Sequence, residues 1–322
     1  MSEIVLSTQS LTKHFVGKSS LLGKIRGKVP LSIPAVDGVS IDIEAGSTVG
    51  LVGESGCGKS TLGRTLVGLY PPTGGSLMLF DRQMGLKRTL EERRVVQMIF
   101  QDPFASLNPR MKVGDMLEEI LLFHHLVSKE KVRERCAELM TLVGLPVSAL
   151  ESYPRQFSGG QRQRIGIARA LALEPKVLIA DEAVSALDVS VQASIVNLLL
   201  DLKRDLGLTM LFISHNIAIV RQVSDRIAVM YLGRIVEEGP TEEVFNNPKH
   251  PYTKLLLSSV PKMTPGSKLG EAPQGELPTM QAAYQGCRFM SRCPISTAAC
   301  QVTDPQLIAV ETPSHLAACI NL

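Results

Sequence analysis

The stretch GESGCGKST, residues 53–61, decides the fold of this chain. It follows a short apolar run at 47–53 and precedes helical spacing that starts near Lys59, so it joins a buried strand to a helix. Its spacing matches G-x-x-x-x-G-K-[ST], a P-loop, in which glycines let consecutive backbone N–H groups converge on phosphate oxygens. The helix N-terminus adds a favourable partial charge. The sequence therefore predicts a phosphate site at this turn.

The loop residues have expected roles in that site. Lys59 is expected to reach the β- and γ-phosphates, Ser60 to bind Mg²⁺, and Thr61 to lie on the phosphate side. Cys57 is expected to be a small structural residue, although a thiol reagent there would act at the expense of ATP binding. The alternative is a Gly-rich turn that matches by chance, which the flanking strand and helix disfavour. The other loop residues expected at the phosphates are Gly53, Glu54, Ser55, Gly56 and Gly58.

A second motif, VLIADEAVSALD at 177–188, places acids at the carboxyl end of a buried strand. Sites of α/β sheets lie at this end of their strands. Asp181 is expected to hold Mg²⁺ through water, and Glu182 to orient or deprotonate an attacking water. The alternative is a pair of solvated acids in a loop.

Composition limits the classes of partner. The chain has 322 residues, 44% of them hydrophobic, which is ample for a large core. Its net charge is only +3, it has no Trp and only 4% aromatic residues, so no nucleic-acid partner is expected. No apolar stretch approaches the roughly 20 residues that span a bilayer, and the start lacks a secretion-signal pattern. The expected location is therefore cytoplasmic.

Strand and helix patterns alternate along the chain. A β-rich segment at 35–53 passes through turn signals at 37–38 and 45–46, and helical spacing within 102–157 predicts a helical insertion. The alternation predicts an α/β fold with a mainly parallel sheet, an antiparallel β portion and a helical subdomain at about 102–165. Further expected elements are strands at 3–9, 176–181 and 209–215, helices at about 160–173 and 190–206, and a hairpin at 226–239.

Composition changes past about residue 245. Pro, Gly and Ser increase there, which predicts a short helix followed by a linker and a small tail that carries four cysteines. The chain is therefore divided into an ATPase-type domain at 1–245 and a C-terminal region at 246–322. Cys136 lies on an expected helix and is interpreted as structural.

With these motifs in order, the chain resembles the ATP-binding subunits of ABC transporters over about residues 4–260. Phe15 in LTKHFV lies where that family stacks an aromatic ring on adenine, although a core position is the alternative. Ala183 departs from the family, which usually has proline after the Walker B glutamate. The matching motifs are Walker A at 53–61, Gln101 in IFQDP as the Q-loop, FSGGQ at 157–161 as the signature, VLIADE as Walker B, SALD at 185–188 as the D-loop, and His215 in FISHN as the switch histidine.

The resemblance implies how the signature acts. Ser158, Gly159, Gly160 and Gln161 would begin a helix that points at the γ-phosphate of ATP bound to a second subunit, with Asp188 of the D-loop nearby. A serine N-cap and bare glycine N–H groups suit an anion. The alternative is an ordinary Gly-Gly helix start.

Two further stretches resemble the peptide-importer branch of the family: FASLNPR after the Q-loop and NNPKHPYTKLLLSSVP at 246–261. The resemblance implies hydrolysis of ATP with Mg²⁺, two transmembrane permease subunits, a second homologous ATPase and an external solute-binding protein. It implies peripheral attachment to the cytoplasmic face of the inner membrane, with Gln101 and residues 102–125 lining a groove for a permease helix. Gln101 would then be both a contact for Mg²⁺ and the attacking water and a mechanical link to the permease. Pro248, Pro251 and Tyr252 are interpreted as structural.

Alternatives to peptide import stay open. Within the branch, the alternative is an ATPase for nickel or glutathione import; outside it, the alternative is a soluble ABC ATPase that acts on ribosomes or DNA. A third class is a sensor whose cysteine tail responds to iron or oxidants. The single ATPase unit and the short helical insertion disfavour the soluble class.

The four tail cysteines also have competing interpretations. The spacing C-x₅-C-x₆-C-x₁₈-C lacks the C-x₂-C pairs of zinc ribbons. Four thiolates suit a [4Fe–4S] cluster, and a small tail with little apolar content needs a metal site or a cross-link to fold. The spacing also resembles that of peptide-importer subunits with such a cluster. Zinc and free thiols are the alternatives. The residues concerned are Cys287, Cys293, Cys300 and Cys319.

Overall fold

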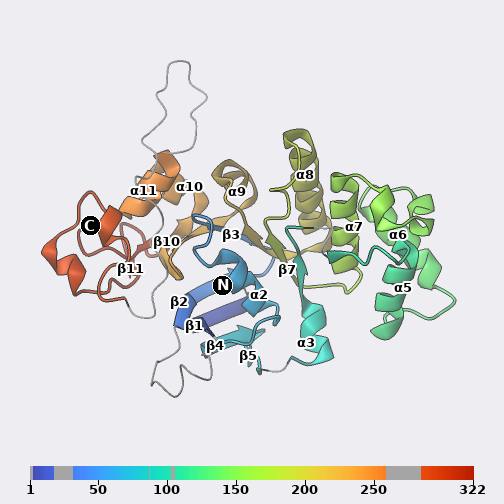
Figure 1. The fold of residues 1–322 in the computed structure, drawn as a ribbon, viewed down its shortest axis with the longest axis horizontal. Coiled ribbons are helices and arrows are strands. Elements are labelled where there is room, and N and C mark those ends of the chain that lie inside the picture. Colours follow the sequence, from blue (N-terminus) through green and yellow to red (C-terminus); the bar gives the residue numbers. More distant parts are fainter. Residues whose placement is uncertain (1–2, 18–31, 87, 103–105, 259–283) are drawn as a thin grey trace.

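The computed structural model describes residues 3–17, 32–86, 88–102, 106–258 and 284–322 (Figure 1). Within these ranges the strands form two sheets, one of four strands and one of eight. The larger sheet has a parallel centre with helices packed on it, so the predicted α/β fold class is confirmed. The expected linker falls largely on 259–283 and part of FASLNPR on 103–105, both outside the described residues.

The four-stranded sheet is antiparallel and has the order β2-β1-β4-β5. β2 runs through the turn signal at 37–38, where Gly38 has φ 74° and the pairing with β1 shifts register, so this signal marks a bulge and not a turn. The signal at 45–46 does mark a turn. The strands are β1 (Ile4–Val16), β2 (Ser32–Glu44), β4 (Gly74–Leu79) and β5 (Arg82–Gln83).

The eight-stranded sheet has the order β11-β12-β10-β9-β3-β8-β7-β6. Its strands β9, β3, β8, β7 and β6 are parallel, whereas β9 and β10 form the predicted antiparallel hairpin. The strands are β3 (Thr48–Val52), β6 (Val96–Ile99), β7 (Val177–Asp181), β8 (Thr209–Ile213), β9 (Arg226–Tyr231), β10 (Arg234–Pro240), β11 (Ile308–Ala309) and β12 (Leu316–Ala317).

The helices follow the predicted periodicity closely. α2 (Lys59–Leu66) begins at Lys59, and α7 (Gly159–Leu171) and α8 (Val189–Leu206) agree with their predicted ranges to within two residues. The helical insertion contains α5 (Val113–Phe123) and α6 (Val132–Leu142), which end earlier than their apolar patterns do. The sequence patterns did not predict β4, β5 and β6 or the short helix α3 (Leu90–Val95).

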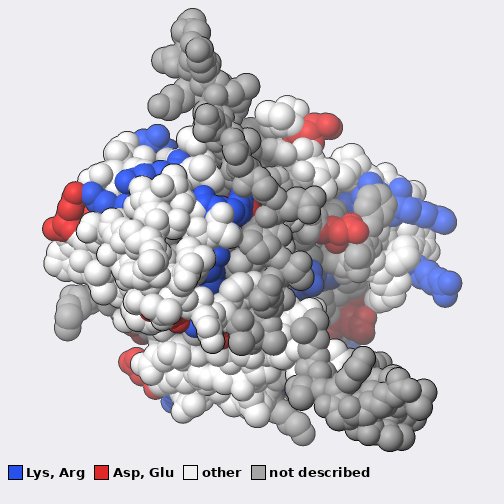
Figure 2. Space-filling model, turned by 60° about the vertical axis from the view of Figure 1, so that its left-hand side comes forward, with Lys and Arg blue, Asp and Glu red and all other residues white. Residues whose placement is uncertain are grey.

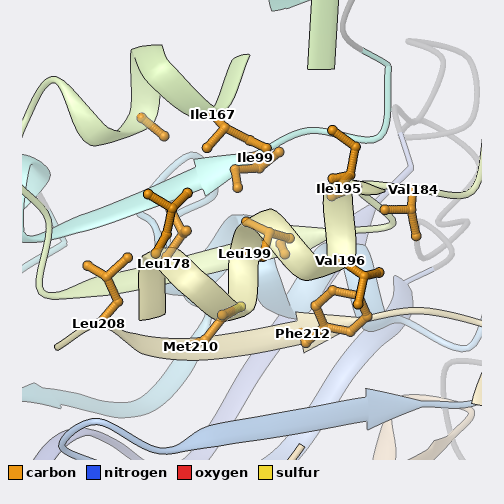
Figure 3. Close-up of a cluster of buried hydrophobic side chains, with 14 of the residues drawn as sticks. Ile99, Ile167, Leu178, Val184, Ile195, Val196, Leu199, Leu208, Met210 and Phe212 are labelled. Atoms are coloured by element: carbon orange, nitrogen blue, oxygen red, sulfur yellow. The ribbon is translucent and has the colours of Figure 1, made fainter. Parts of the chain in front are cut away.

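The parallel strands are buried on both faces, as covered parallel sheets require. Leu178, Met210 and Phe212 face α8, where Leu199 and Val196 pack on them (Figure 3). Alternate residues such as Ile179 and Leu211 face the opposite side and join the core beneath the four-stranded sheet. The carboxyl ends of the strands are therefore held rigidly between two cores.

The C-terminal region lies at one end of the molecule, and α5 and α6 lie at the other (Figure 1). Its last strand, β12, pairs antiparallel with β10, so the region extends the main sheet at its edge. A boundary at 245 and 246 between two regions stays a prediction. The remaining elements are α9 (Ile217–Val223), α10 (Thr241–Asn246), α11 (Pro251–Ser258) and the 3-10 helices η1 (Val147–Glu151), η2 (Pro154–Gln156), η3 (Met290–Arg292) and η4 (Ala298–Gln301).

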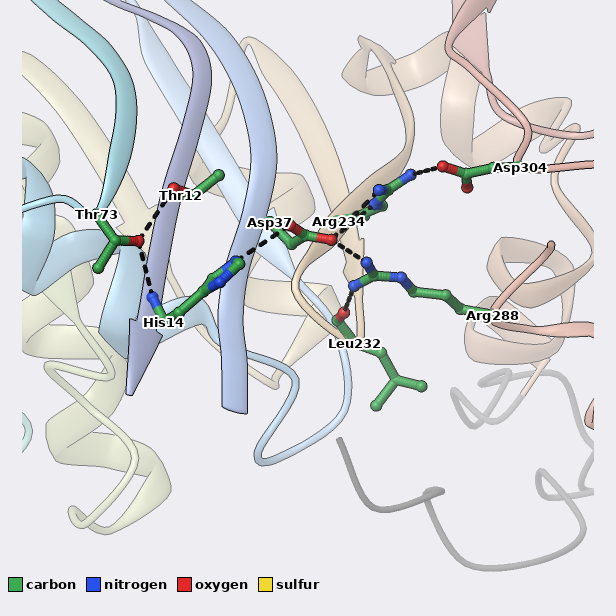
Figure 4. A network of polar contacts seen from close by, with 8 residues as sticks. All are labelled: Thr12, His14, Asp37, Thr73, Leu232, Arg234, Arg288 and Asp304. Atoms are coloured by element: carbon green, nitrogen blue, oxygen red, sulfur yellow. Dashed lines mark hydrogen bonds and ion pairs between the residues drawn. The ribbon is translucent and has the colours of Figure 1, made fainter. Parts of the chain in front are cut away.

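A polar network fastens this region to the antiparallel sheet (Figure 4). Asp37 of β2 accepts hydrogen bonds from Arg288 of the tail and from Arg234 of β10, while His14 contacts its other oxygen. Burial acts to raise the pKa of Asp37, but the two guanidinium groups outweigh burial and lower it. Arg234 also bonds Asp304. The tail is thus joined to β2 and β10 by ion pairs.

The face that carries the C-terminal region shows acidic and basic side chains in separate small groups among neutral residues (Figure 2). The visible surface therefore offers no broad field of one sign, in keeping with the net charge of +3. Among the helices in the described ranges, none combines the length and apolarity needed to cross a bilayer.

Candidate nucleotide site

Strand register gathers the predicted site residues at one edge of the eight-stranded sheet. Ile213 of β8 pairs with Leu51 of β3 on one side and with Asp181 of β7 on the other. Ile99 of β6 pairs with Ala180 of β7. Because these strands are parallel, the segments after β3, β6, β7 and β8 leave the sheet at the same edge. Those segments carry the P-loop, Gln101, Glu182 and His215.

The P-loop is held tightly against the rest of the chain. Gly58, the N-cap of α2, has φ 113°, and a Cβ there would lie 2.1 Å from the carbonyl oxygen of Ala35, so only glycine fits. Lys59 is 4% exposed, and its ammonium donates to the carbonyls of Gly53 at 2.7 Å and Glu54 at 2.9 Å. In the chain alone, the lysine therefore closes the loop on itself.

Ser60 and Asp181 form a candidate magnesium site. The Ser60 hydroxyl donates to Oδ1 of Asp181 at 2.7 Å. Asp181 is 1% exposed, and its Oδ2 is buried with no hydrogen-bond partner among the described residues. Burial raises the pKa of this carboxyl, with the Ser60 hydrogen bond acting against it. The Ser60 hydroxyl and the unpartnered carboxylate oxygen of Asp181 are both oxygen ligands of the kind that Mg²⁺ prefers. The two residues therefore fit Mg²⁺.

Three predicted residues meet at one carboxylate oxygen. Gln101 donates from Nε2 to Oε2 of Glu182 at 3.0 Å, and Nδ1 of His215 lies 3.5 Å from the same oxygen. Glu182 has φ 46°, a left-handed conformation that costs a non-glycine residue energy and is typical of functional positions. Ala183, which stands where the resembling family usually has proline, is 2% exposed.

The expected adenine position proves to be an aromatic pair. Phe15 is 37% exposed at the end of β1, and its ring meets Tyr70 edge-on at a centroid distance of 5.4 Å. The ammonium of Lys13 lies 5.2 Å from the Phe15 centroid. Sequence reasoning missed Tyr70; its place just before Pro71-Pro72, in a turn after α2, was the available signal.

The signature residues begin α7 as predicted. Ser158 is the N-cap and forms a capping box with Gln161, with bonds of 3.3 Å and 3.0 Å. A Cβ on Gly160 would lie 2.5 Å from Cγ1 of Val191 in α8, so this glycine also permits close helix packing. Asp188 is the N-cap of α8 without a side-chain cap bond. The side chain of each of these two residues, Ser158 and Gln161, accepts a hydrogen bond from the backbone amide of the other.

Two contacts between the P-loop and the C-terminal region were not predicted. The amide of Glu54 donates to the hydroxyl of Tyr252 at 2.9 Å, and the carboxylate of Glu54 forms two bonds, at 2.9 and 3.0 Å, with the guanidinium of Arg292. Both partners belong to the C-terminal region. No local sequence pattern predicts either contact, because each partner lies about 200 or more positions from Glu54 in sequence.

The tail cysteines lie near one another without forming a ligand set. Burial chiefly raises the pKa of Cys287 and Cys293, and the charges of other tail cysteines add to it. Hydrogen bonds from Thr297 and Asn321 lower the pKa of Cys300. Across the described ranges, which include all four tail thiols, no three His, Cys, Asp or Glu side chains are placed to hold a metal ion. The arrangement as it stands does not fit zinc or an iron–sulfur cluster.

The two remaining cysteines are buried. Burial raises the pKa of Cys57, which is fully buried in the P-loop, and raises that of Cys136 to about 11. Neither thiol has the lowered pKa of a reactive cysteine.

Comparison with known families gives two matches along the chain. Residues 36–185 match the family described as ABC transporter, and residues 236–300 match the family described as oligopeptide/dipeptide transporter, C-terminal region. The first match spans the P-loop, the signature and the two acids. The second contains Tyr252 and Arg292.

Relatives match over nearly the whole chain. The di/tripeptide transport ATP-binding protein DppF of Pseudomonas aeruginosa is 46% identical over 309 residues, covering 95% of this chain and 94% of that protein. The dipeptide transport ATP-binding protein DppF of Escherichia coli is also 46% identical, covering 95% and 92%.

Solved structures share the fold. One is cbiO1 from Clostridium perfringens, part of the ABC transporter complex cbiONQ, with TM-score 0.63, 26% identity and coverage of 76% of this chain and 92% of that one. Another is a dimeric, post-hydrolysis ATP-binding cassette bound to ADP and Pi, with TM-score 0.63, 28% identity and coverage of 73% and 98%.

Proposed function

The chain belongs to the ABC transporter family, as an ATP-binding subunit of its oligopeptide and dipeptide branch, and we propose that it powers the uptake of di- or oligopeptides. It is an ATPase, and hydrolysis is coupled to permease subunits in the membrane. The observation that carries the proposal is the meeting of Gln101, Glu182 and His215 beside the P-loop, in a chain that is 46% identical to two dipeptide transport ATP-binding proteins.

The proposed chemistry is in-line attack of water on the γ-phosphate of ATP. Lys59 turns from the carbonyls of Gly53 and Glu54 to the phosphates, and the loop amides bind phosphate oxygens. Ser60 and Asp181 would hold Mg²⁺, which would supply positive charge beside the phosphate oxygens. Glu182 orients the attacking water or accepts its proton.

Gln101 and His215 are proposed to position that water. Both side chains contact Oε2 of Glu182, so they fix the direction of its carboxylate. Gln101 begins the segment that is proposed to line the permease groove, with residues 102–125. Movement of the permease would then reach the water through the hydrogen bond from Gln101 to Glu182.

ATP is proposed to be bound between two ATPase subunits. Ser158, Gly159, Gly160 and Gln161 of one subunit, with Asp188 beside them, would face the γ-phosphate held by the P-loop of the other. The capped start of α7 supports this role, because its free amides and Ser158 suit an anion. The dimeric form of a cassette with 28% identity supports the assembly. Loss of the γ-phosphate would open the dimer.

The assembly is proposed to contain two permeases, a second homologous ATPase and an external solute-binding protein that delivers the peptide. The chain would lie peripherally on the cytoplasmic face of the inner membrane. The test is to purify the tagged chain in mild detergent from its native membranes and identify what accompanies it. The co-purified complex, placed in vesicles, should hydrolyse ATP faster when peptide-loaded binding protein is added.

The outcomes of this test separate the candidates. Stimulation by nickel-loaded or glutathione-loaded binding protein instead of peptide would assign the alternative solutes. Recovery without permeases, or with ribosomes or DNA, would overturn the transport proposal. A matched complex that carries Glu182→Gln should assemble normally and show no stimulation.

The tail cysteines enter the proposal separately. The spacing of the four tail cysteines, which resembles that of peptide-importer subunits with a [4Fe–4S] cluster, is what supports such a cluster. The lack of an assembled ligand set counts against it. Iron and sulfide analysis after anaerobic purification decides: about four of each per chain supports the cluster, and a colourless, iron-free protein excludes it.

A further inference from the structure

Glu54 is the second residue of the P-loop and is held at three of its groups. Its carbonyl accepts from Lys59, its amide donates to Tyr252, and its carboxylate pairs with Arg292. Only the first contact lies within the loop. The other two come from the C-terminal region, beyond the part of the chain that supplies the nucleotide motifs.

The contact with Arg292 is shielded from water. The side chain of Arg292 is 7% exposed and that of Glu54 is 18% exposed. The guanidinium makes two parallel bonds, which fix orientation as well as distance. Donation to the Glu54 carboxylate raises the pKa of Arg292, so the arginine stays charged at any physiological pH.

The contact with Tyr252 is rigid. Tyr252 is fully buried and packs against Tyr231 and Phe289, with ring centroids 4.6 Å and 5.5 Å away. Burial raises the pKa of its hydroxyl, so the phenol stays neutral and accepts the Glu54 N–H. The three rings come from β9, α11 and the tail. Their packing holds the Tyr252 hydroxyl in place, so the P-loop amide that bonds it is held as well.

These contacts matter most when nucleotide is bound. Lys59 now ties the carbonyls of Gly53 and Glu54, and it gives up these bonds when it turns to a phosphate. The bond that the Glu54 amide donates to Tyr252 and those that its carboxylate accepts from Arg292 need not change, because they involve atoms other than the carbonyl. They can therefore keep the loop in its phosphate-binding shape after the lysine has left.

We propose that Tyr252 and Arg292 are positioning residues for ATP binding, through which the C-terminal region holds the P-loop open for phosphate. The inference rests on the proposed nucleotide role of this loop. It predicts that weakening either contact raises the Kd and KM for ATP while kcat in the assembled complex changes little, because neither residue touches the γ-phosphate.

Arg288 provides a matched control. It lies four positions before Arg292 in the same tail, its side chain is also 7% exposed, and it also forms an ion pair, but with Asp37 of β2 instead of the P-loop. Arg288→Gln therefore removes a buried tail arginine without touching Glu54. A general loosening of the tail would affect both variants alike.

The test is calorimetric titration of the full chain with ATP and Mg²⁺, with melting temperatures measured for each variant. Arg292→Gln and Glu54→Gln should each raise the Kd about ten-fold, and the double variant should be no weaker than the worse single one. Tyr252→Phe, which keeps the ring packing, should raise it about three-fold. Arg292→Lys should restore part of the loss, and Arg288→Gln should stay within about two-fold of wild type.

Several results would overturn the inference. These are an unchanged Kd in Arg292→Gln and Tyr252→Phe, an equal loss in Arg288→Gln, or additive losses in the double variant. If Arg292→Gln fails to fold, Glu54→Gln and Tyr252→Phe give the answer. A wild-type chain that binds no ATP would overturn the proposed function as well, whereas wild-type binding with unaffected variants overturns this inference alone.

Discussion

The nucleotide edge and the C-terminal region are built in opposite ways. At the nucleotide edge, the P-loop, Gln101, Glu182 and His215 each follow a parallel strand, and the order of those strands brings them together. In the C-terminal region, the important contacts join residues far apart in sequence. Arg292 lies 238 positions from Glu54, and Arg288 lies 251 positions from Asp37.

The two regions also differ in how their polar groups are satisfied. Oδ2 of Asp181 has no hydrogen-bond partner in the described parts of the chain, and Lys59 makes bonds that it can exchange. Where the C-terminal region packs on β10, by contrast, Glu237 is fully buried, accepts from the amides of Lys249 and His250, and contacts the ring of His315. One region keeps capacity to bind a ligand, and the other uses its charges to hold the chain together.

The largest expected effect is at the nucleotide edge. Glu182→Gln should lower ATP hydrolysis by the assembled complex about 10²–10⁴-fold and leave ATP binding intact, because the amide cannot accept the proton of water. Turnover and ATP affinity should be measured side by side. Turnover near the wild-type rate would remove Glu182 from its proposed role.

A smaller effect is expected from the candidate magnesium site. Ser60→Ala should weaken ATP binding about ten-fold in the presence of Mg²⁺ and change it little with EDTA, because only the metal contact is lost. Titration under both conditions isolates this term. An equal loss with and without Mg²⁺ would show that Ser60 acts on the loop and not on the metal.

The aromatic pair of Phe15 and Tyr70 should contribute less to ATP binding than the candidate magnesium site. Phe15→Ala should weaken ATP binding about three- to ten-fold, whereas inorganic tripolyphosphate, which has no base, should bind as before. Phe15→Tyr serves as the conservative control and should retain ATP affinity. If tripolyphosphate binding falls equally, the ring supports the fold and does not stack on the base.

The smallest effect on activity is expected at His250 of the C-terminal region, where the change appears in the free energy of unfolding. Burial lowers the pKa of His250 from 6.5 to about 4. Between these values the unfolded chain binds a proton that the folded chain does not, so this group makes stability fall as pH drops through that window. Above pH 6.5 the His250 ring is neutral in both the folded and the unfolded chain, so its titration does not change the free energy of unfolding.

Urea unfolding at pH 7.5 and pH 5 measures this term. His250→Asn, which keeps an acceptor for the Tyr252 amide that now bonds Nδ1, should lose less stability than wild type between the two conditions. The expected difference is about 1.4 kcal/mol per pH unit within the window. An identical pH dependence in both proteins would show that His250 does not titrate differently on folding.

Sequence reasoning succeeded where structure is local. The P-loop, α7, α8 and the hairpin of β9 and β10 follow from periodicity and turn signals, and Ser158 was recognised as an N-cap. It failed at 37–38, where a glycine that could have made a turn instead accommodates a bulge because β1 continues alongside.

It also could not reach contacts set by tertiary packing. Tyr252 lies in a stretch that marks the family branch, but nothing local to Tyr252 or Arg292 predicts a contact with Glu54, since that contact depends on how the C-terminal region packs on the P-loop. The tail cysteines show the reverse problem. Their spacing suggested a ligand set, but spacing alone does not determine whether four thiols converge.

Hydrogen exchange of the P-loop tests the central claim, that the C-terminal region is part of the nucleotide site. The Glu54 amide, which donates to Tyr252, should exchange faster in Tyr252→Phe and in Arg292→Gln than in wild type. Amides of the central strands β3 and β8 should be unchanged in both variants. Unaltered exchange at Glu54 would contradict the claim and confine the nucleotide site to the motif-bearing part of the chain.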